Sequence, residues 1–201
     1  AFYFGMDAYR DRTQAEQDTR VAVEASRLVR MHTPIIGPQG APVTIVEFFD
    51  PACETCRAFY PLVKQIMAQH PGKVRLALRY APFHHGSDQV VKLMEAARKQ
   101  GLYIPVLEAL LAAQPAWADH AAPNLDLAFE AAARAGLDMG RARQDMETPE
   151  IHAVIAQDVE DLTALQVKKT PTFFVNGRSL PSFGPEQLAS LVAEEVATSR
   201  P

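Results

Sequence analysis

Hydrophobic and polar positions change their spacing along the chain, and the spacings predict an α/β protein. Residues 43–50, VTIVEFFD, form a continuous β-branched and aromatic run, typical of a strand covered on both faces. Residues 73–80, KVRLALRY, alternate in polarity and predict a second strand. Between them, residues 56–72 carry apolar side chains at helical spacing and end on Pro71 and Gly72. This order predicts a right-handed unit of two parallel strands joined by a helix.

A long helical segment and a second pair of strands follow. Residues 87–167 have helical spacing throughout, and we expect Trp117 to pack in their core. Residues 170–181, TPTFFVNGRSLP, predict a strand, an Asn-Gly turn and a short second strand before a last helix. The expected start signals of helices in both segments are Ser87, Asn124, Thr148 with Pro149, and Pro185.

The chain is therefore expected to form one α/β domain with a helical insertion. Residues 41–86 and 168–201 would build the α/β domain, and residues 87–167 would be the insertion. Residues 1–40 would be an N-terminal helix or stalk and a linker. Within them, residues 13–31 contain good helix formers but only a ragged apolar stripe at Val21, Leu28 and Met31.

The start of the chain allows two interpretations. The sequence begins at Ala1, followed by FYFG, which could be the end of a cleaved signal or of a membrane anchor upstream of residue 1. It could equally be an arbitrary boundary. Residues 33–42, TPIIGPQGAP, are rich in Pro and Gly and mark the entry to the compact domain.

Composition excludes some classes of partner. The 20 basic and 24 acidic residues are spread along the chain, so no basic stripe could neutralise a phosphate backbone. We therefore expect no nucleic-acid partner. No apolar stretch approaches the roughly 20 residues that a membrane helix needs. With 48% hydrophobic residues, the chain can bury a sizeable core.

The two cysteines, Cys53 and Cys56, raise the question of chemistry. A disulfide between them would close a tiny loop and stabilise the fold little, so reactivity is the better reason for the pair. Cys53 would lie at the start of a helix, where free N–H groups and the helix dipole lower a thiol pKa. Its thiolate could attack a disulfide, and Cys56, one turn further, could resolve the mixed disulfide.

Other uses of the thiol pair are a metal site and an inert structural disulfide. A zinc site needs two more ligands, and none of the six histidines gives a usual pair spacing, since His84 and His85 are adjacent. We expect these two histidines in a loop near the active face, and no resident metal or cofactor. A soft ion such as Cu(I) held between the two thiolates is the alternative function.

The segments VEFFDPACETCRAFYP and TPTFFVNG together resemble the thioredoxin fold, in its DsbA-like branch with a helical insertion. The resemblance spans about residues 41–198 and makes Cys53 and Cys56 the redox couple. It places Glu47 where these proteins keep a buried acid, which could exchange a proton with Cys56. Thr170 and Pro171 stand where they keep a cis-proline facing the cysteines. Pro61 matches a proline that kinks the helix.

Two of these positions also have ordinary interpretations. Glu47 could instead be a strand acid paired with Arg75 or Arg79. The bond before Pro171 could be an ordinary trans bond.

The resemblance implies a thiol–disulfide oxidoreductase that acts on cysteines of other proteins in the periplasm or another extracytoplasmic compartment. A redox partner protein, soluble or membrane-bound, would reset the cysteines. Thr170, Pro171, Glu54 and Thr55 would contact the substrate, with the exposed backbone at Thr170 pairing as an added strand. Oxidase, isomerase and reductase all remain open.

The residues between the cysteines depart from the strong oxidases. Glu54 and Thr55 stand where strongly oxidising DsbA proteins carry a Pro-His pair. Glu54 and Asp50 would oppose a thiolate, whereas Arg57 and the Thr55 hydroxyl would support it. We expect a couple less oxidising than that of the strong oxidases, because a stabilised thiolate is what makes a disulfide oxidising.

Overall fold

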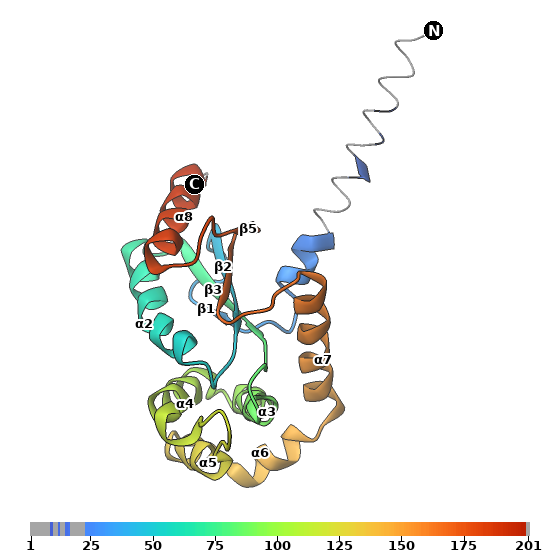
Figure 1. The fold of residues 1–201 in the computed structure, drawn as a ribbon, viewed down its shortest axis with the longest axis vertical. Coiled ribbons are helices and arrows are strands. Elements are labelled where there is room, and N and C mark those ends of the chain that lie inside the picture. The colour runs from blue at the N-terminus through green and yellow to red at the C-terminus, as the bar shows by residue number, and fades with distance from the viewer. Residues whose placement is uncertain (1–8, 10–11, 13–14, 17–22, 200–201) are drawn as a thin grey trace.

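A central mixed sheet organises the protein (Figure 1). The structure is a computed structural model that describes residues 9, 12, 15–16 and 23–199. Its strands, all within the described residues, form one five-stranded sheet in the order β1-β3-β2-β4-β5. They are β1 (Ile35–Ile36), β2 (Val43–Phe49), β3 (Val74–Tyr80), β4 (Thr172–Val175) and β5 (Arg178–Ser179). β2 pairs in parallel with β3, as predicted, and antiparallel with β4.

Helices cover both faces of the sheet. α2 (Glu54–Gln69) and α8 (Pro185–Thr198) lie on one face, and α7 (Pro149–Ala164) lies on the other (Figure 1). The side chains of β2 alternate between these two layers: Val43, Ile45 and Phe49 belong to the core beneath α2, whereas Val46 and Phe48 pack with Leu162 of α7. The sequence expectation of a strand buried on both faces is confirmed.

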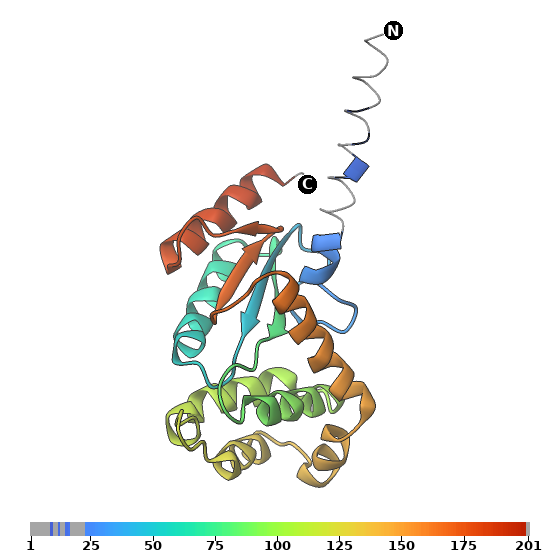
Figure 2. The same ribbon diagram turned by 45° about the vertical axis from the view of Figure 1, so that its right-hand side comes forward.

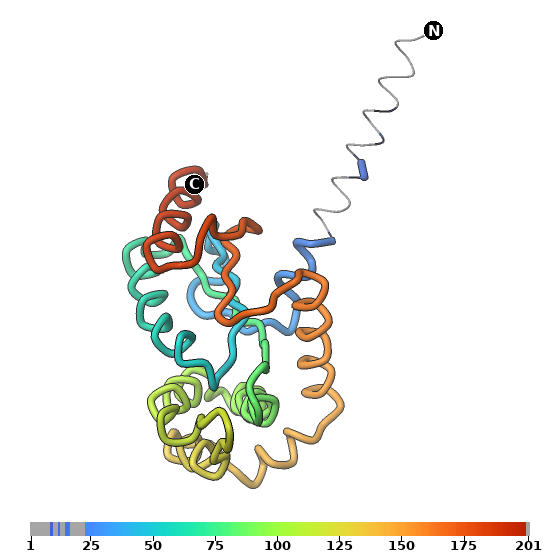
Figure 3. Tube along the Cα trace, in the orientation of Figure 1, coloured from blue at the N-terminus to red at the C-terminus, as the bar shows by residue number. Residues whose placement is uncertain are grey.

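Four helices lie beyond one end of the sheet, as Figure 2 shows. They are α3 (Ser87–Lys99), α4 (Tyr103–Trp117), α5 (Leu125–Arg134) and α6 (Met139–Met146), and α7 follows them along the face of the sheet. The chain leaves the sheet after β3 and returns to β4 only through α7 (Figure 3). Trp117 is fully buried and its indole N–H donates to the Leu110 carbonyl at 2.9 Å, so its predicted core role is confirmed. No helix within the described residues is long and apolar enough to cross a membrane.

The residues at the starts of the helices can be compared with the predicted N-caps. Asn124 caps α5 by accepting from the Leu127 N–H, and Pro149 follows Thr148 at the start of α7, as predicted. The prediction for Ser87 was wrong: Gly86, with a φ of 79°, is the N-cap of α3. Ser87 is the first residue of the helix, and its hydroxyl instead donates a charge-assisted hydrogen bond to the buried carboxylate of Asp50 at 2.6 Å.

Two short elements were not predicted. β1 is only two residues long and pairs with β3 from within the Pro- and Gly-rich entry segment. α6 is an eight-residue helix whose N-cap, Asp138, accepts from the Arg141 N–H at 3.1 Å. Neither is long enough to show a clear period in the sequence.

The predicted N-terminal helix is described only in part. Residues 23–28 are helical and Leu28 is buried, whereas Met31 lies beyond the helix and is fully exposed. Val21 and residues 13–14 and 17–22 lie outside the described residues.

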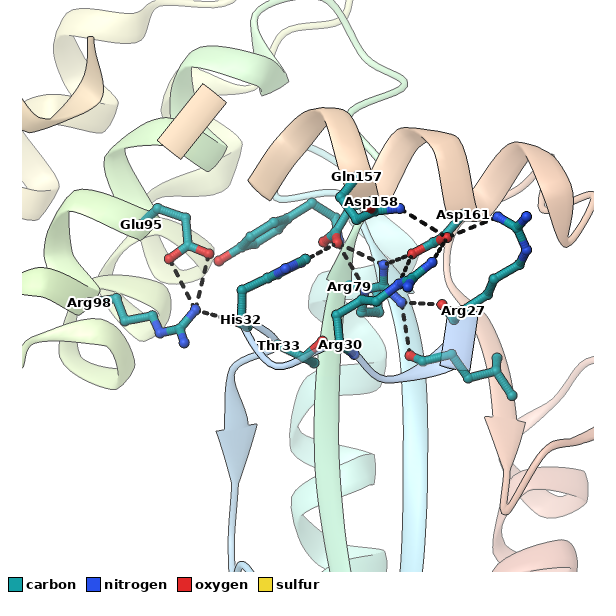
Figure 4. A network of polar contacts seen from close by, with 12 residues as sticks. Arg27, Arg30, His32, Thr33, Arg79, Glu95, Arg98, Gln157, Asp158 and Asp161 are labelled. Carbon is teal, nitrogen blue, oxygen red and sulfur yellow. Dashed lines mark hydrogen bonds and ion pairs between the residues drawn. The ribbon is translucent and has the colours of Figure 1, made fainter. Parts of the chain in front are cut away.

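A buried ionic cluster joins this N-terminal segment to the sheet and α7 (Figure 4). Arg79 of β3 is fully buried and donates to Asp158 at 2.8 and 2.9 Å and to Asp161 at 2.7 Å. Arg30 donates to Asp161 at 2.7 and 2.8 Å, and the His32 ring lies 2.8 Å from Asp158. The predicted alternation of β3 is therefore real, but Arg79 on its charged face is fully buried.

Replacing Arg79 should destabilise the protein strongly. The change Arg79→Met leaves Asp158 and Asp161 buried without their main partner, which costs about 3–5 kcal/mol of unfolding free energy. Urea unfolding monitored by circular dichroism measures this loss. The matched control is Arg134→Met, which removes an exposed pair with Glu130 and should change stability by less than about 0.5 kcal/mol. Equal losses in the two variants would contradict the role of the cluster.

Candidate active site

Cys53 is the N-cap of α2, directly after the turn that follows β2. Its backbone is extended, with φ −81° and ψ 120°, and its Sγ accepts the Cys56 N–H at 3.2 Å. The thiol thus takes the place that a Ser or Asp oxygen usually occupies at a helix start. Both cysteines are free thiols, with Cys53 6% exposed and Cys56 completely buried.

The two thiols have opposite acidities. Hydrogen bonding from the Cys56 thiol, from Thr170 and from the Cys56 and Thr55 backbone lowers the pKa of Cys53 to about 6, against the opposing effect of burial. Burial raises the pKa of Cys56 far above its ordinary value, and the thiolate of Cys53 and the charge of Glu47 add to that rise. The geometry therefore concentrates negative charge on Cys53.

Thr170 and Pro171 lie against Cys53 although they are more than 110 residues away in the chain. The peptide bond between them is cis. The Thr170 carbonyl accepts the Cys53 thiol at 3.4 Å. They come together because β4, which starts at Thr172, pairs antiparallel with β2.

Glu47 is buried in β2 beneath the cysteines. It is 1% exposed, and burial, with the nearby charge of Cys53, raises its pKa to about 8. The alternative of an ion pair with Arg75 or Arg79 is wrong. Arg75 donates to the Thr44 hydroxyl and the Gln39 carbonyl, while Arg79 faces the opposite layer and binds Asp158 and Asp161.

Asp50 organises the backbone around the turn. Its fully buried carboxylate accepts from the Ala52 N–H at 2.9 Å, from Ser87, and from the N–H groups of Phe83 and His84. The His84 ring also lies 2.7 Å from it. We expected this charge to oppose the thiolate, but its oxygens are engaged by these donors, so its effect on Cys53 is reduced.

Glu54 and Thr55 are exposed at the start of α2. Glu54 lies 3.3 Å from the ring of His120, and the His120 ring packs on that of His84 at 4.7 Å between centroids. His84 thus lies near the active face, as expected, but the approach of His120 was not anticipated. Among the described residues, no group of three or more His, Cys, Asp or Glu side chains is arranged to hold a metal ion.

Gln114 of α4 is a site residue that the sequence did not reveal. Its buried side-chain N–H groups donate to the Pro51 carbonyl at 2.7 Å and to the Cys53 carbonyl at 3.0 Å. Its Oε1 has no hydrogen-bond partner among the described residues. A lone glutamine in a helix carries no signal of this kind, because only the packing of α4 against the turn brings it to Cys53.

The model of the thioredoxin family matches residues 30–194. A thioredoxin-like oxidoreductase from Silicibacter pomeroyi is 29% identical, with a TM-score of 0.75 over 87% of this chain and 98% of that chain. BdbD from Bacillus subtilis, at 20% identity and a TM-score of 0.72, covers 82% of this chain and 93% of its own, and shares the fold. The chain belongs to the thioredoxin family.

Proteins named as Na(+)/H(+) antiporters also match this chain, each over part of its own length. The Na(+)/H(+) antiporter NhaA 3 of Salinispora tropica is 34% identical over 170 residues, which cover 82% of this chain and 25% of that protein. NhaA of Herminiimonas arsenicoxydans is 31% identical over 146 residues, 73% of this chain and 22% of that protein. The chain thus spans about a quarter of the length of these relatives.

The acidity of Cys53 can be measured directly. The far-ultraviolet absorbance of the thiolate should titrate with a pKa of about 6 in the reduced protein, and this step should be absent in Cys53→Ser. A thiol that titrates near 9 would contradict the hydrogen bonding described at the helix start.

The lowered pKa of Cys53 also makes the stability of the reduced protein depend on pH. Because the folded pKa is lowered, Cys53 stabilises the reduced protein fully above pH 9, and this stabilisation is lost as the pH falls through about 6. At pH 7 it amounts to about 1.4 kcal/mol. Glu47, whose pKa is raised, has the opposite effect, because its contribution to stability is lost as the pH rises to about 8. The free energy of unfolding of the parent must therefore be compared with that of Cys53→Ser, which keeps Glu47 buried.

Proposed function

We propose that this protein is a thiol–disulfide oxidoreductase that exchanges disulfides with cysteines of extracytoplasmic proteins through Cys53 and Cys56. The observation that carries the proposal is the Cys53 sulfur, which accepts a helix N–H and has a pKa of about 6. At neutral pH this residue is largely a thiolate, the form that attacks disulfides. Cys56 lies within the same helical turn, where it can reach the Cys53 sulfur.

The reaction proceeds in two exchanges. The Cys53 thiolate attacks one sulfur of a substrate disulfide, forming a mixed disulfide and releasing the other substrate sulfur as a thiolate, which takes up a proton. Cys56 loses its proton and attacks the Cys53 sulfur. This forms the Cys53–Cys56 disulfide and releases the second substrate thiol, so the substrate gains the two electrons that the protein loses. The reverse sequence oxidises a substrate dithiol.

Glu47 supplies the proton control for Cys56. With a pKa of about 8, this carboxyl group is mostly protonated at neutral pH, yet it can ionise at small cost. In the oxidising direction it donates a proton to Cys56 as that sulfur leaves the disulfide. In the reducing direction its carboxylate accepts the Cys56 proton. A buried thiol with a strongly raised pKa needs such a partner to become a nucleophile.

Substrate docks at the segment that faces Cys53. The Thr170 carbonyl already accepts the Cys53 thiol, so a substrate chain that pairs with the Thr170 backbone would bring its own sulfur to the same place. Pro171 supports that backbone from the buried side, and the exposed Glu54 and Thr55 border the approach. We therefore propose an extended polypeptide around a cysteine as the substrate.

We also propose a compartment and a redox partner for this protein. Among solved structures of the same fold is a periplasmic thioredoxin-like protein from Salmonella enterica, at 18% identity and a TM-score of 0.70 over 88% of this chain and 97% of that chain. We place the present protein in an extracytoplasmic compartment, where disulfides persist. A separate redox partner protein, soluble or membrane-bound, would return Cys53 and Cys56 to the state that the reaction consumes.

The reduction potential tests the proposal and sets the direction of electron flow. A Cys53 pKa of about 6 lies between those of thioredoxin, about 7, and DsbA, about 3.5. The potential should therefore lie between about −270 and −120 mV. Equilibration in graded glutathione buffers, with thiol trapping and mass measurement, gives this value. A pair that never exchanges, or that binds Cu(I) stoichiometrically without exchange, would contradict the proposed function.

Replacing Glu47 should slow the resolving step more than the first attack. We expect Glu47→Gln to lower the rate of mixed-disulfide resolution by about a hundredfold, because general acid–base groups contribute at least that much. Rapid-quench kinetics with a peptide disulfide separates the two steps. The variant should also gain stability relative to the parent above pH 8, since the buried amide never ionises. A variant that slows both steps equally would contradict the proton role.

A further inference from the structure

A polar cavity lies beside the cysteines, between the first turn of α2 and the end of α4. Its volume is about 510 Å³, and its walls include Glu54, Arg57, Gln114, Asp119 and His120. Glu54 follows Cys53 directly, and Gln114 donates to the Cys53 carbonyl, so the cavity lies beside the Cys53 backbone at the start of α2. The cis-proline segment lies against the Cys53 sulfur itself and does not line this cavity.

The two acids in the wall already have partners. Glu54 lies 3.3 Å from the His120 ring. Asp119 accepts the N–H groups of Ala121 and Ala122, both at 2.9 Å, and these bonds hold its pKa below the ordinary value. Neither carboxylate forms an ion pair with Arg57.

Arg57, unlike the two acids in this wall, has no partner for its charged group among the described residues. Its backbone N–H donates to the Cys53 carbonyl at 3.1 Å, but its guanidinium makes no hydrogen bond or ion pair within the described part of the chain. The side chain is partly buried and lies one helical turn from Cys53, on the same side of α2. A guanidinium offers five donors in a planar fork that matches a carboxylate. The cavity therefore presents, one helical turn from Cys53, a guanidinium whose geometry suits a carboxylate.

We propose that this cavity is a substrate subsite, in which Arg57 binds the carboxylate of an Asp or Glu side chain close to the substrate's cysteine. The proposal rests on the proposed function and adds a preference to it: acidic residues beside the cysteine favour exchange. The pairing of Glu54 with His120 supports the same preference, because it reduces the repulsion that Glu54 would exert on an acidic substrate.

Arg57 could alternatively serve the Cys53 thiolate. Such a role predicts that Arg57→Gln raises the pKa of Cys53 and slows every substrate alike. The subsite predicts a change that depends on the charge of the substrate, with the Cys53 pKa near its parent value. The two roles are thus separated by one titration and one comparison of peptides.

The test uses three peptide disulfides that differ only beside the cysteine, where they carry Asp, Asn or Lys. The parent protein should have a kcat/KM about fivefold higher for the Asp peptide than for the Asn peptide, as a partly exposed ion pair allows. Arg57→Gln should abolish this preference, Arg57→Lys should restore part of it, and Arg57→Glu should favour the Lys peptide. Arg134→Gln, an exposed arginine of α5, is the matched control and should keep the parent preference.

A binding measurement separates this inference from the proposed function. Peptides with serine in place of cysteine cannot exchange, yet calorimetry should show the Asp peptide binding about fivefold tighter than the Asn peptide to the parent and equally to Arg57→Gln. Binding preference without exchange would refute the oxidoreductase proposal and support the subsite. Equal binding of the peptides to the parent, or an unchanged preference in Arg57→Gln, would overturn the subsite.

Discussion

One hydrogen bond organises the chemistry of this protein: the Cys56 N–H donates to the Cys53 sulfur at the start of α2. A helix start leaves N–H groups without partners, and a sulfur that accepts one of them is more stable as a thiolate. Everything around the turn holds Cys53 in this position. Asp50 binds the backbone on one side, Gln114 binds the Pro51 and Cys53 carbonyls on another, and Thr170 lies against the sulfur.

Beneath this charged sulfur the protein places groups that remain neutral. Burial raises the pKa of both Cys56 and Glu47, so the protons that the proposed reaction must move are held on these two groups. The contrast arises from depth: Cys53 lies at the helix tip among N–H donors, whereas Glu47 projects from β2 into the core beneath α2. Two adjacent environments thus set opposite acidities within a few residues of sequence.

The opposite face of the sheet carries charge for a structural reason. Arg79, Asp158 and Asp161 are fully buried, and with Arg30 and His32 they join β3, α7 and the N-terminal segment (Figure 4). Such a cluster is costly to break, because each lost partner leaves a buried charge. It also fixes α7, the helix that returns the chain from the helical segment to β4 and therefore to Thr170.

The strands β2 and β3, the helix between them, the later helical segment and the pair Cys53 and Cys56 follow from the sequence, because local periodicity and spacing encode them. The sequence could not show whether Glu47 pairs with an arginine, because the opposite faces of β2 and β3 are distinguished only when helices cover them. Gln114, His120 and the free guanidinium of Arg57 likewise depend on how α4 packs against the start of α2. What the sequence by itself determined was therefore the elements and the reactive pair. Tertiary structure alone decided which distant side chains surround that pair, since contacts between segments far apart in the chain leave no local pattern.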